Sequence, residues 1–167
     1  MTDATAPSPP EGGEVLVQET LAGAYQVRAQ VAGNSFLMDE PLSAGGLGTG
    51  PNPYDLLSSA LGACTAMTLR LYAQRKAWPL TRVSVRVLHV RATLEARDRF
   101  AREIVLEGDL GHDQKQKLLE IANRCPVHLT LERGADVITT MSRPDLAHAD
   151  DGDPGQHVRH MAQACAD

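Results

Sequence analysis

One long segment, from Asn52 to about Lys76, limits the folds open to this chain more than any other feature. Asn52 is typical of a helix N-cap and Pro53 of a first helical position, and apolar side chains then recur with the 3.6-residue period of a helix. Alanine and leucine also occupy the opposite face, and charge appears only from Arg70 onward. Because a helix that is apolar nearly all round avoids water, we expect it to lie buried at the centre of the fold.

The segments around that helix mostly alternate apolar and polar residues, which is the pattern of half-buried strands. A second helix is predicted over 112–124, where apolar residues form one stripe, and a short turn starts at Pro126. The predicted order is βββ-α-ββ-α-β, an α+β domain with strands over 14–20, 24–32, 35–39, 81–93, 100–110 and 135–141.

Both ends of the chain are poor in apolar residues. Residues 1–12 are rich in Pro, Ser, Ala and Gly, and residues 143–167 are polar, with Asp, His and Gly. Neither segment can bury enough apolar surface to offset the entropy of ordering it, so we expect both to be disordered. The folded domain is therefore predicted to span 13–142.

Charge and hydropathy exclude several classes of protein. The net charge is −5, and Arg97, Arg99 and Arg102 alternate with acidic residues, so we interpret them as a solvated strand connection and not as a nucleic-acid surface. No apolar run reaches the roughly 18 residues of a membrane span, and the first residues do not resemble a signal peptide. We therefore expect a cytoplasmic protein, in which three cysteines do not indicate a disulfide framework.

Cys64 lies about three turns inside the long helix, too far from its start for the helix dipole to lower the thiol pKa. A reactive Cys64 needs a cation or a hydrogen-bond donor from elsewhere in the fold. The alternative is a structural thiol, since free cysteine is among the most buried residue types.

Cys125 precedes Pro126 and is the N-cap if that proline opens a helical turn. Backbone N–H groups would then favour its thiolate, and the alternative is a small helix-ending residue. The two cysteines could form a redox pair, but they lack the spacing of a metal site.

Two other groups of residues have simpler interpretations. The glycines at 45, 46, 48 and 50 match no phosphate-binding motif and more plausibly let a loop pass close to another backbone. The tail carries His148, His157, His160 and Cys165, for which a solvated tail is favoured over metal binding.

Two stretches resemble the hallmarks of OsmC-like proteins, also called the OsmC/Ohr-like family, over residues 14–141. They are GGLGTGPNPYDLLSSALGACTAMTLRLYAQRKAWPL and LLEIANRCPVHLTLERGADV. In that family a glycine-rich loop leads into an N-P-x-x-L-L helix that carries a cysteine, and a C-P pair follows a later helix. The pattern is most similar to a less characterised branch of the family.

The resemblance implies an intertwined homodimer whose two central helices are buried together, with active sites at the subunit interface. It also implies that Cys64 attacks a small hydroperoxide as a thiolate. Cys125 then resolves the sulfenic acid to a disulfide, which an external dithiol reductant reopens. No cofactor, metal, nucleic acid or membrane is expected.

Two positions depart from the family pattern. Active relatives carry an Arg in the first hairpin turn and a Glu after the N-P, whereas here the turn is Leu21-Ala22-Gly23-Ala24 and the Glu position is Tyr54. Arg28 is a candidate to replace the missing Arg, and Tyr54 a candidate hydrogen-bond donor. Asp55 is adjacent but points about 100° away around the helix.

The leading hypothesis is a cysteine-based reductase of organic hydroperoxides that serves oxidative stress defence. The apolar surroundings expected for the cysteines favour organic peroxides over hydrogen peroxide. The missing Arg and Glu favour an alternative, a non-peroxidase dimer that binds a hydrophobic small molecule or an electrophile. A structural homodimer with inert buried thiols is the third interpretation.

Overall fold

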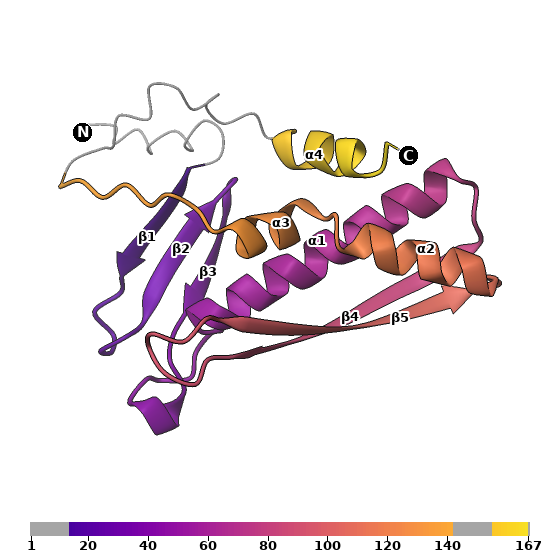
Figure 1. Ribbon diagram of the computed structural model, residues 1–167. Coiled ribbons are helices and arrows are strands. Elements are labelled where there is room, and N and C mark those ends of the chain that lie inside the picture. The colour runs from indigo at the N-terminus through magenta and orange to yellow at the C-terminus, as the bar shows by residue number, and fades with distance from the viewer. Residues whose placement is uncertain (1–13, 142–154, 167) are drawn as a thin grey trace. The chain divides into compact units, whose positions relative to one another are not determined.

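The computed structural model describes residues 14–141 and 155–166, which fall into two compact units (Figure 1). The first unit contains the described residues up to Pro53 together with Met141, and the second contains 54–140 and 155–166. The elements, in chain order, are β1 (Val15–Glu19), β2 (Val27–Val31), β3 (Asn34–Met38), the 3-10 helix η1 (Leu42–Ala44), α1 (Pro53–Arg75), β4 (Leu80–Val90), β5 (Arg99–Gly108), α2 (His112–Ala122), α3 (Pro126–Arg133) and α4 (Gln156–Ala164). The predicted α+β class is confirmed. No helix in this part of the chain is both long and apolar enough to cross a membrane.

The first unit is built on a three-stranded antiparallel sheet in the order β1-β2-β3. Ala32 and Gly33 join β2 to β3, and both have a positive φ, 47° and 75°. Such a two-residue turn matches the twist of the strands it connects, and glycine adopts this backbone conformation without strain. The sheet confirms the predicted three-stranded meander.

The carboxylate of Asp39 organises the loop that follows β3. It accepts hydrogen bonds from the N–H groups of Glu40, Leu47 and Thr49 and from the Thr49 hydroxyl, at 2.8–3.3 Å. Burial alone would raise the pKa of Asp39, but these hydrogen bonds outweigh it and the pKa is lowered. One buried acidic group thus holds both ends of the glycine-rich loop.

Two glycines in this loop are required by close backbone contacts. A Cβ on Gly46 would lie 1.9 Å from the Glu40 carbonyl oxygen, and one on Gly50 would lie 2.2 Å from the Leu37 carbonyl oxygen. The prediction that the glycines let the loop pass close to another backbone is therefore confirmed.

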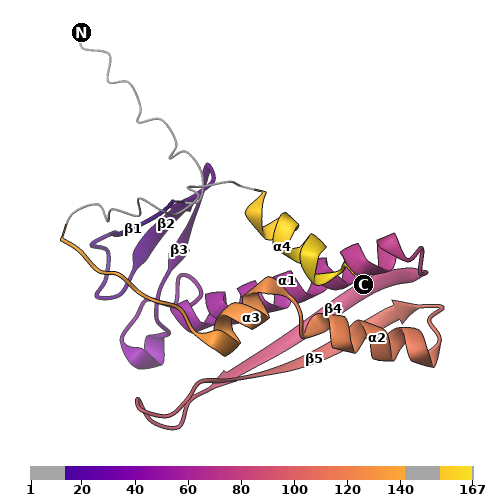
Figure 2. The ribbon, with the colours of Figure 1, turned by 45° about the horizontal axis from the view of Figure 1, so that its top comes forward.

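In the second unit, α1 runs along the antiparallel β4–β5 ribbon (Figures 1 and 2). Gly62 lies at the contact, where its Cβ position is 3.5 Å from the Val87 side chain. The ribbon alternates as predicted, with Val83, Val85 and Val87 turned inward. The main core joins α1, the ribbon and α2 through Leu69, Tyr72, Ala73, Leu80, Leu110, Leu118, Ile121 and Ala122.

The predicted long helix is present, but the single chain buries only one side of it. Buried residues recur at Leu61, Cys64, Thr65, Thr68, Leu69, Tyr72 and Ala73. The opposite face carries Leu57, Ala60, Ala63 and Met67, which are exposed in the structure. Because both faces of this helix are apolar, the sequence predicted a helix that is buried on all sides.

Two predictions for the region after α2 are wrong. The turn expected at Pro126 is the eight-residue helix α3. The strand expected over 135–141 is absent, because this segment pairs with no strand in the described structure, and Val137 and Ile138 are largely exposed. Its β-branched residues alone cannot form a strand without a neighbour to supply hydrogen bonds.

The expected disorder of residues 1–12 and of 143–154 lies outside the described residues. The prediction is wrong for Gln156–Ala164, which form α4. His157, Met161 and Cys165 are four residues apart and share one stripe, along which Met161 and Cys165 are buried. A few well-spaced side chains order this helix although its composition is polar.

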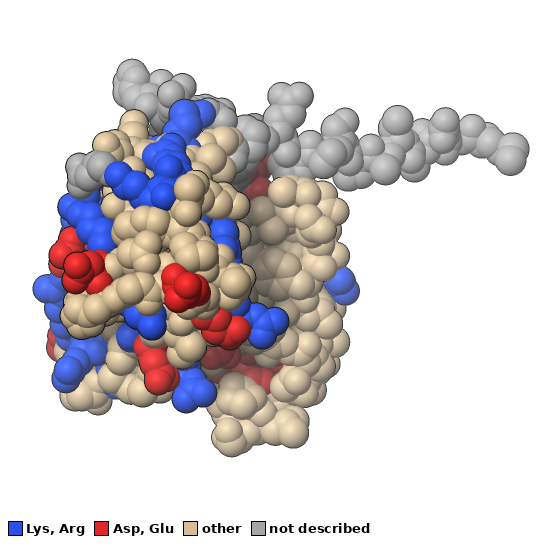
Figure 3. All heavy atoms as spheres, turned by 90° about the vertical axis from the view of Figure 1, so that its right-hand side faces the viewer, with Lys and Arg blue, Asp and Glu red and all other residues tan. Residues whose placement is uncertain are grey.

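The surface of the second unit mixes charges of both signs. On the face shown in Figure 3, Lys and Arg side chains lie among Asp and Glu side chains. Part of this mixture is paired, as in the ion pairs Arg86–Glu103 and Lys117–Glu120. Such exposed pairs contribute little to stability.

Substitution of Leu118 tests the core of the second unit. Leu118 is fully buried, so we expect Leu118→Ala to lower the free energy of unfolding by about 2–5 kcal/mol. The adjacent Leu119 is 45% exposed, and Leu119→Ala should cost less than about 1 kcal/mol. Chemical denaturation of both variants measures the difference, and equal effects would contradict the assigned core.

Candidate functional site

Cys64 from α1 and Cys125 from the start of α3 meet in one small apolar cluster. Both are buried, with 2% and 0% of their surfaces exposed, and neither is in a disulfide. Leu61 is buried with them, and Val87, Phe100, Val127 and Leu131 pack around the three. The packing of α3 on α1 thus brings together two cysteines that have 60 residues between them in the sequence.

The first turn of α3 points its backbone N–H groups at both sulfurs. Cys125 is the N-cap of this helix, as predicted, and its Sγ accepts from the His128 N–H at 3.4 Å. The preceding amide, Val127 N–H, donates to Cys64 Sγ, also at 3.4 Å. Pro126 at the first helical position has no N–H to satisfy, so the two free amides that follow it are both used on sulfur.

A cation from β5 lies on the Cys125 side of the pair. The Arg102 Nη1 atom is 3.9 Å from Cys125 Sγ and donates to the Thr65 hydroxyl at 2.7 Å. Thr65 Oγ1 is itself 3.7 Å from Cys125 Sγ. The other guanidinium nitrogen donates to Asn123 Oδ1 at 3.0 Å, which fixes the direction of the side chain.

These contacts separate the protonation states of the two thiols. The hydrogen bond from the Cys64 thiol is the largest influence on Cys125 and lowers its pKa, while burial acts against it. The His128 N–H, Thr65 and Arg102 lower it further, to about 5. The same hydrogen bond, followed by burial, raises the pKa of Cys64. These contacts therefore favour the negative charge of the pair on Cys125 and its remaining proton on Cys64.

An imidazole lies on the other side of Cys64. His157, from α4, places its Nε2 atom 3.2 Å from Cys64 Sγ. Each sulfur thus has its own polar neighbour, Arg102 for Cys125 and His157 for Cys64.

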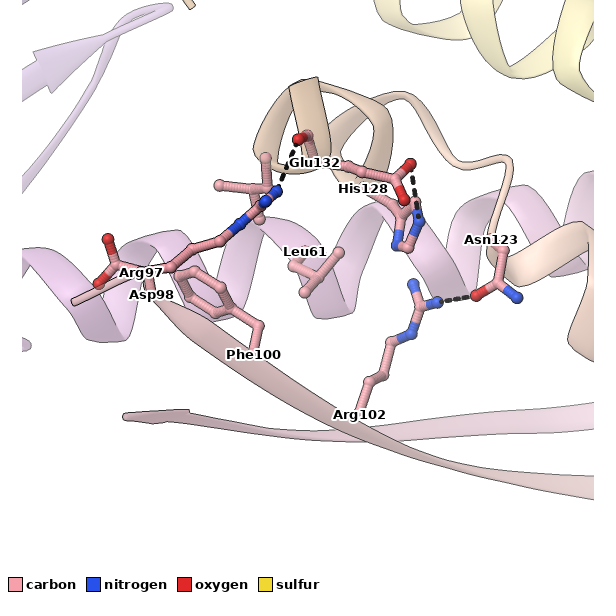
Figure 4. Close-up of a pocket in the computed structure, with 9 residues that line it drawn as sticks. Leu61, Arg97, Asp98, Phe100, Arg102, Asn123, His128 and Glu132 are labelled. Atoms are coloured by element: carbon pink, nitrogen blue, oxygen red, sulfur yellow. Dashed lines mark hydrogen bonds and ion pairs between the residues drawn. The ribbon is translucent and has the colours of Figure 1, made fainter. Parts of the chain in front are cut away.

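A pocket of about 340 Å³ opens beside the cysteine cluster (Figure 4). Leu61, Phe100 and Leu131 form its apolar wall, and they also pack against the two cysteines. Its remaining lining is polar, from Arg97, Asp98, Arg102, Asn123, His128 and Glu132. Neither sulfur lines the pocket, but Arg102 and His128 reach from its lining to Cys125.

Tyr54 and Asp55, two of the other predicted site residues, lie away from Cys64 near the start of α1. Tyr54 stacks on His89, with ring centroids 4.3 Å apart. The Arg91 guanidinium lies over the Tyr54 ring, 5.3 Å from its centroid. Ten residues of helix separate Tyr54 from Cys64, about 15 Å along the axis, so the two do not touch within one chain. Asp55 is exposed, one residue further along.

Arg28 is on β2 in the first unit, opposite Gln18 and Leu37 in the strand ladders. Its side chain is exposed there. Its role as the replacement for the missing family Arg stays a prediction.

Among the residues in contact with the sulfurs, sequence reasoning missed two ionisable side chains, Arg102 and His157. Arg102 was interpreted as part of a solvated connection, yet it shares the inward parity of Phe100 and Ile104 on β5. His157 was assigned to a solvated tail, although its four-residue spacing from Met161 and Cys165 was available in the sequence. Both residues could have been recognised from their periodic spacing, Arg102 along the strand and His157 along the helix. The charged residues next to them in the sequence obscured this spacing.

The match to a family of known proteins covers this site. The family model described as OsmC-like protein matches residues 46–140, more than half of the 167 residues. The chain belongs to the OsmC-like protein family. The matched range includes α1, the ribbon, α2 and α3, with both cysteines and Arg102, but it ends before α4.

Solved structures of several OsmC-like proteins share this fold. A candidate osmotic stress and detoxification response protein from Psychrobacter arcticus 273-4 is 21% identical, with a TM-score of 0.61 over 71% of this chain and 88% of that one. An OsmC-like protein from Mycoplasma pneumoniae is 18% identical, with a TM-score of 0.60 over 71% and 86%. An organic hydroperoxide resistance protein from Legionella pneumophila is 20% identical, with a TM-score of 0.57 over 74% and 91%. No curated protein sequence matches the chain.

Replacement of Arg102 tests the charge distribution at the pair. In the wild type, the first proton should leave the pair near pH 5, so one thiolate is present at pH 7 and is lost below about pH 5. Arg102→Met removes a cation that favours the thiolate, and should move this midpoint upward by about one pH unit. Thiolate absorbance at 240 nm, followed from pH 4 to 9, gives the midpoint.

The matched control is Arg99→Met, which removes an exposed arginine from the same strand. It should leave the midpoint unchanged. Equal midpoints in all three proteins would contradict the role assigned to Arg102.

Proposed function

We propose that this OsmC-like protein is a thiol-dependent peroxidase that reduces organic hydroperoxides with the Cys64–Cys125 pair. The observation that carries this proposal is the meeting of the two buried thiols in one apolar cluster, with backbone N–H groups on both sulfurs and Arg102 beside Cys125. A structural role for both cysteines would not require an N-cap, a threonine and an arginine around one of them. The similarity to an organic hydroperoxide resistance protein supports the same chemistry.

In the proposed cycle, Cys64 attacks and Cys125 resolves. Cys64 sulfur bonds to one peroxide oxygen, the O–O bond breaks, and an alcohol leaves while Cys64 becomes a sulfenic acid. Cys125, already a thiolate, then attacks the Cys64 sulfur and displaces hydroxide, which solvent protonates. A dithiol reductant reopens the disulfide, in a compartment such as the cytoplasm, where thiols are kept reduced.

The surroundings of the pair favour an organic peroxide. The cluster around the sulfurs is apolar, and the pocket beside it has an apolar wall of Leu61, Phe100 and Leu131. An alkyl or aryl group can cover this wall, whereas hydrogen peroxide gains nothing from it. We therefore propose organic hydroperoxides as substrates and oxidative stress defence as the role.

A single oxidation experiment tests the proposal. The reduced protein is mixed with a slight excess of cumene hydroperoxide, and the intact mass and free thiols are measured. The wild type should lose two thiols and about two hydrogens of mass and yield a Cys64–Cys125 peptide. Cys64→Ser should not react, and Cys125→Ser should stop at a sulfenic acid that dimedone traps.

Cys165→Ser is the control, because Cys165 lies against the Thr68 carbonyl and not in the cysteine cluster. It should still lose two thiols and yield the Cys64–Cys125 peptide, because a serine hydroxyl can also donate to the Thr68 carbonyl. Survival of all thiols would overturn the peroxidase and favour the ligand-binding alternative. A Cys125→Ser protein that turns over normally with a dithiol would remove the resolving role, and a sulfenic acid on Cys125 in Cys64→Ser would reverse the two roles.

We further propose that the protein is a homodimer in which α1 packs against its counterpart. The exposed face of Leu57, Ala60, Ala63 and Met67 is apolar and made of small or flexible side chains, which allow two helices to approach closely. Burial of this face in a dimer would explain a helix that is apolar on both sides.

Met67→Glu places a charge in the centre of that face and should convert the dimer to a monomer. Sedimentation velocity at micromolar concentration measures the change. Leu119→Glu, at an exposed position on α2, should remain dimeric. A monomeric wild type, or a dimeric Met67→Glu protein, would contradict the proposal.

A further inference from the structure

The proposed chemistry leaves one proton without an acceptor. Cys64 must attack as a thiolate, yet its thiol is held protonated by the hydrogen bond to Cys125 and by burial. The Val127 N–H helps to accommodate negative charge on Cys64 but cannot take up a proton. Arg102 cannot accept one either, because a guanidinium keeps its charge in proteins.

The imidazole of His157 is placed where this proton must go. Its Nε2 atom is 3.2 Å from Cys64 Sγ, within the distance that hydrogen bonds to sulfur allow. Histidine is the side chain best suited to accept and return a proton near neutral pH. The side chain is half-buried, so the contact is partly shielded from water.

The position of His157 follows from the packing of α4 against α1 and α3. One and two turns further along the same stripe, Met161 is buried and the Cys165 thiol donates to the Thr68 carbonyl at 3.7 Å. The Arg75 guanidinium, at the end of α1, donates to the Ala162 carbonyl at 2.8 Å. Three separate contacts thus hold the helix that presents the imidazole.

We propose that His157 is a catalytic residue, the general base that deprotonates Cys64 and the general acid that protonates the departing alkoxide. This inference rests on the proposed peroxidase function and adds to it a residue from outside the matched family range.

The step balances as follows. Neutral His157 takes the proton of the Cys64 thiol at Nε2, and the thiolate attacks one oxygen of an organic hydroperoxide. The S–O bond forms as the O–O bond breaks, so sulfur loses two electrons and the peroxide gains them. The alkoxide takes the proton from His157 and leaves as an alcohol, and His157 returns to its neutral form.

The other titratable groups near this contact come from α3 and β5. Cys125, at the start of α3, and Arg102, from β5, are in contact with each other. The His128 backbone N–H contacts Cys125, whereas the His128 imidazole lines the pocket and lies 3.7 Å from the Glu132 carboxylate. Arg75 and Arg124 act on Cys165, at the far end of α4. Among the described residues, His157 is thus the proton acceptor in contact with Cys64 that is not already committed to Cys125.

The test uses the full chain with Cys125→Ser and Cys165→Ser. Cys64 is then the one of the three cysteines that remains. The rate of Cys64 modification by methyl methanethiosulfonate is followed from pH 5 to 10, with and without His157→Gln. We expect the substitution to move the midpoint of this profile upward by about one pH unit or more. The rate of sulfenic acid formation with cumene hydroperoxide at pH 7 should fall by about 100-fold.

His160→Gln is the matched control, because His160 is on the same helix but exposed. It should leave the profile and the oxidation rate unchanged. Circular dichroism and a second variant, His157→Asn, separate an effect of the imidazole from a loss of α4. Both His157 variants should give the same shift while the helix content stays that of the parent.

The outcomes separate this inference from the proposed function. A profile and a rate that stay within twofold of the parent would overturn the role of His157, and so would a Cys64 that does not react at any pH. A Cys64 that depends on His157 toward methyl methanethiosulfonate but is not oxidised by the hydroperoxide supports the proton transfer and overturns the peroxidase.

Discussion

The start of α3 is the contact on which the rest of the site depends. The N–H groups of its second and third residues, Val127 and His128, donate to Cys64 and Cys125 respectively. One helix terminus therefore joins a sulfur on α1 to the sulfur of the α3 N-cap. Pro126 makes this possible, because it fixes the first helical residue without adding a competing N–H. The unequal protonation of the two thiols, the position of Arg102 beside Cys125 and the apolar wall of the pocket all follow from that arrangement.

The fold was predictable where the sequence carries a clear period. The long helix, the alternating ribbon and the N-cap at Cys125 were all recognised because local spacing determines them. The segment 135–141 shows the limit of this reasoning, since it is rich in β-branched residues but strand formation needs a neighbouring strand. The exposed face of α1 shows another, because a sequence records that a surface is apolar and not which part of an assembly covers it.

The site was predictable in its reacting atoms and less so in their surroundings. Cysteine is rare in this chain and therefore conspicuous, whereas Arg102 is one of many charged residues and differs from Arg99 only by its parity on β5. His157 lies 93 residues from the sulfur that it contacts. Contacts of this kind depend on tertiary packing, which no local pattern specifies.

The docking of α4 has a consequence for how this protein responds to mild stress. The helix is short and buries few side chains, chiefly Met161 and Cys165, so it belongs to the least stable parts of the second unit. It can detach by local unfolding while the ribbon and α1 stay folded. Detachment carries His157 away from Cys64 and leaves Arg102 and Cys125 in place. Warmth or low denaturant would thus separate the Cys64 thiol from its proton acceptor well before the protein unfolds.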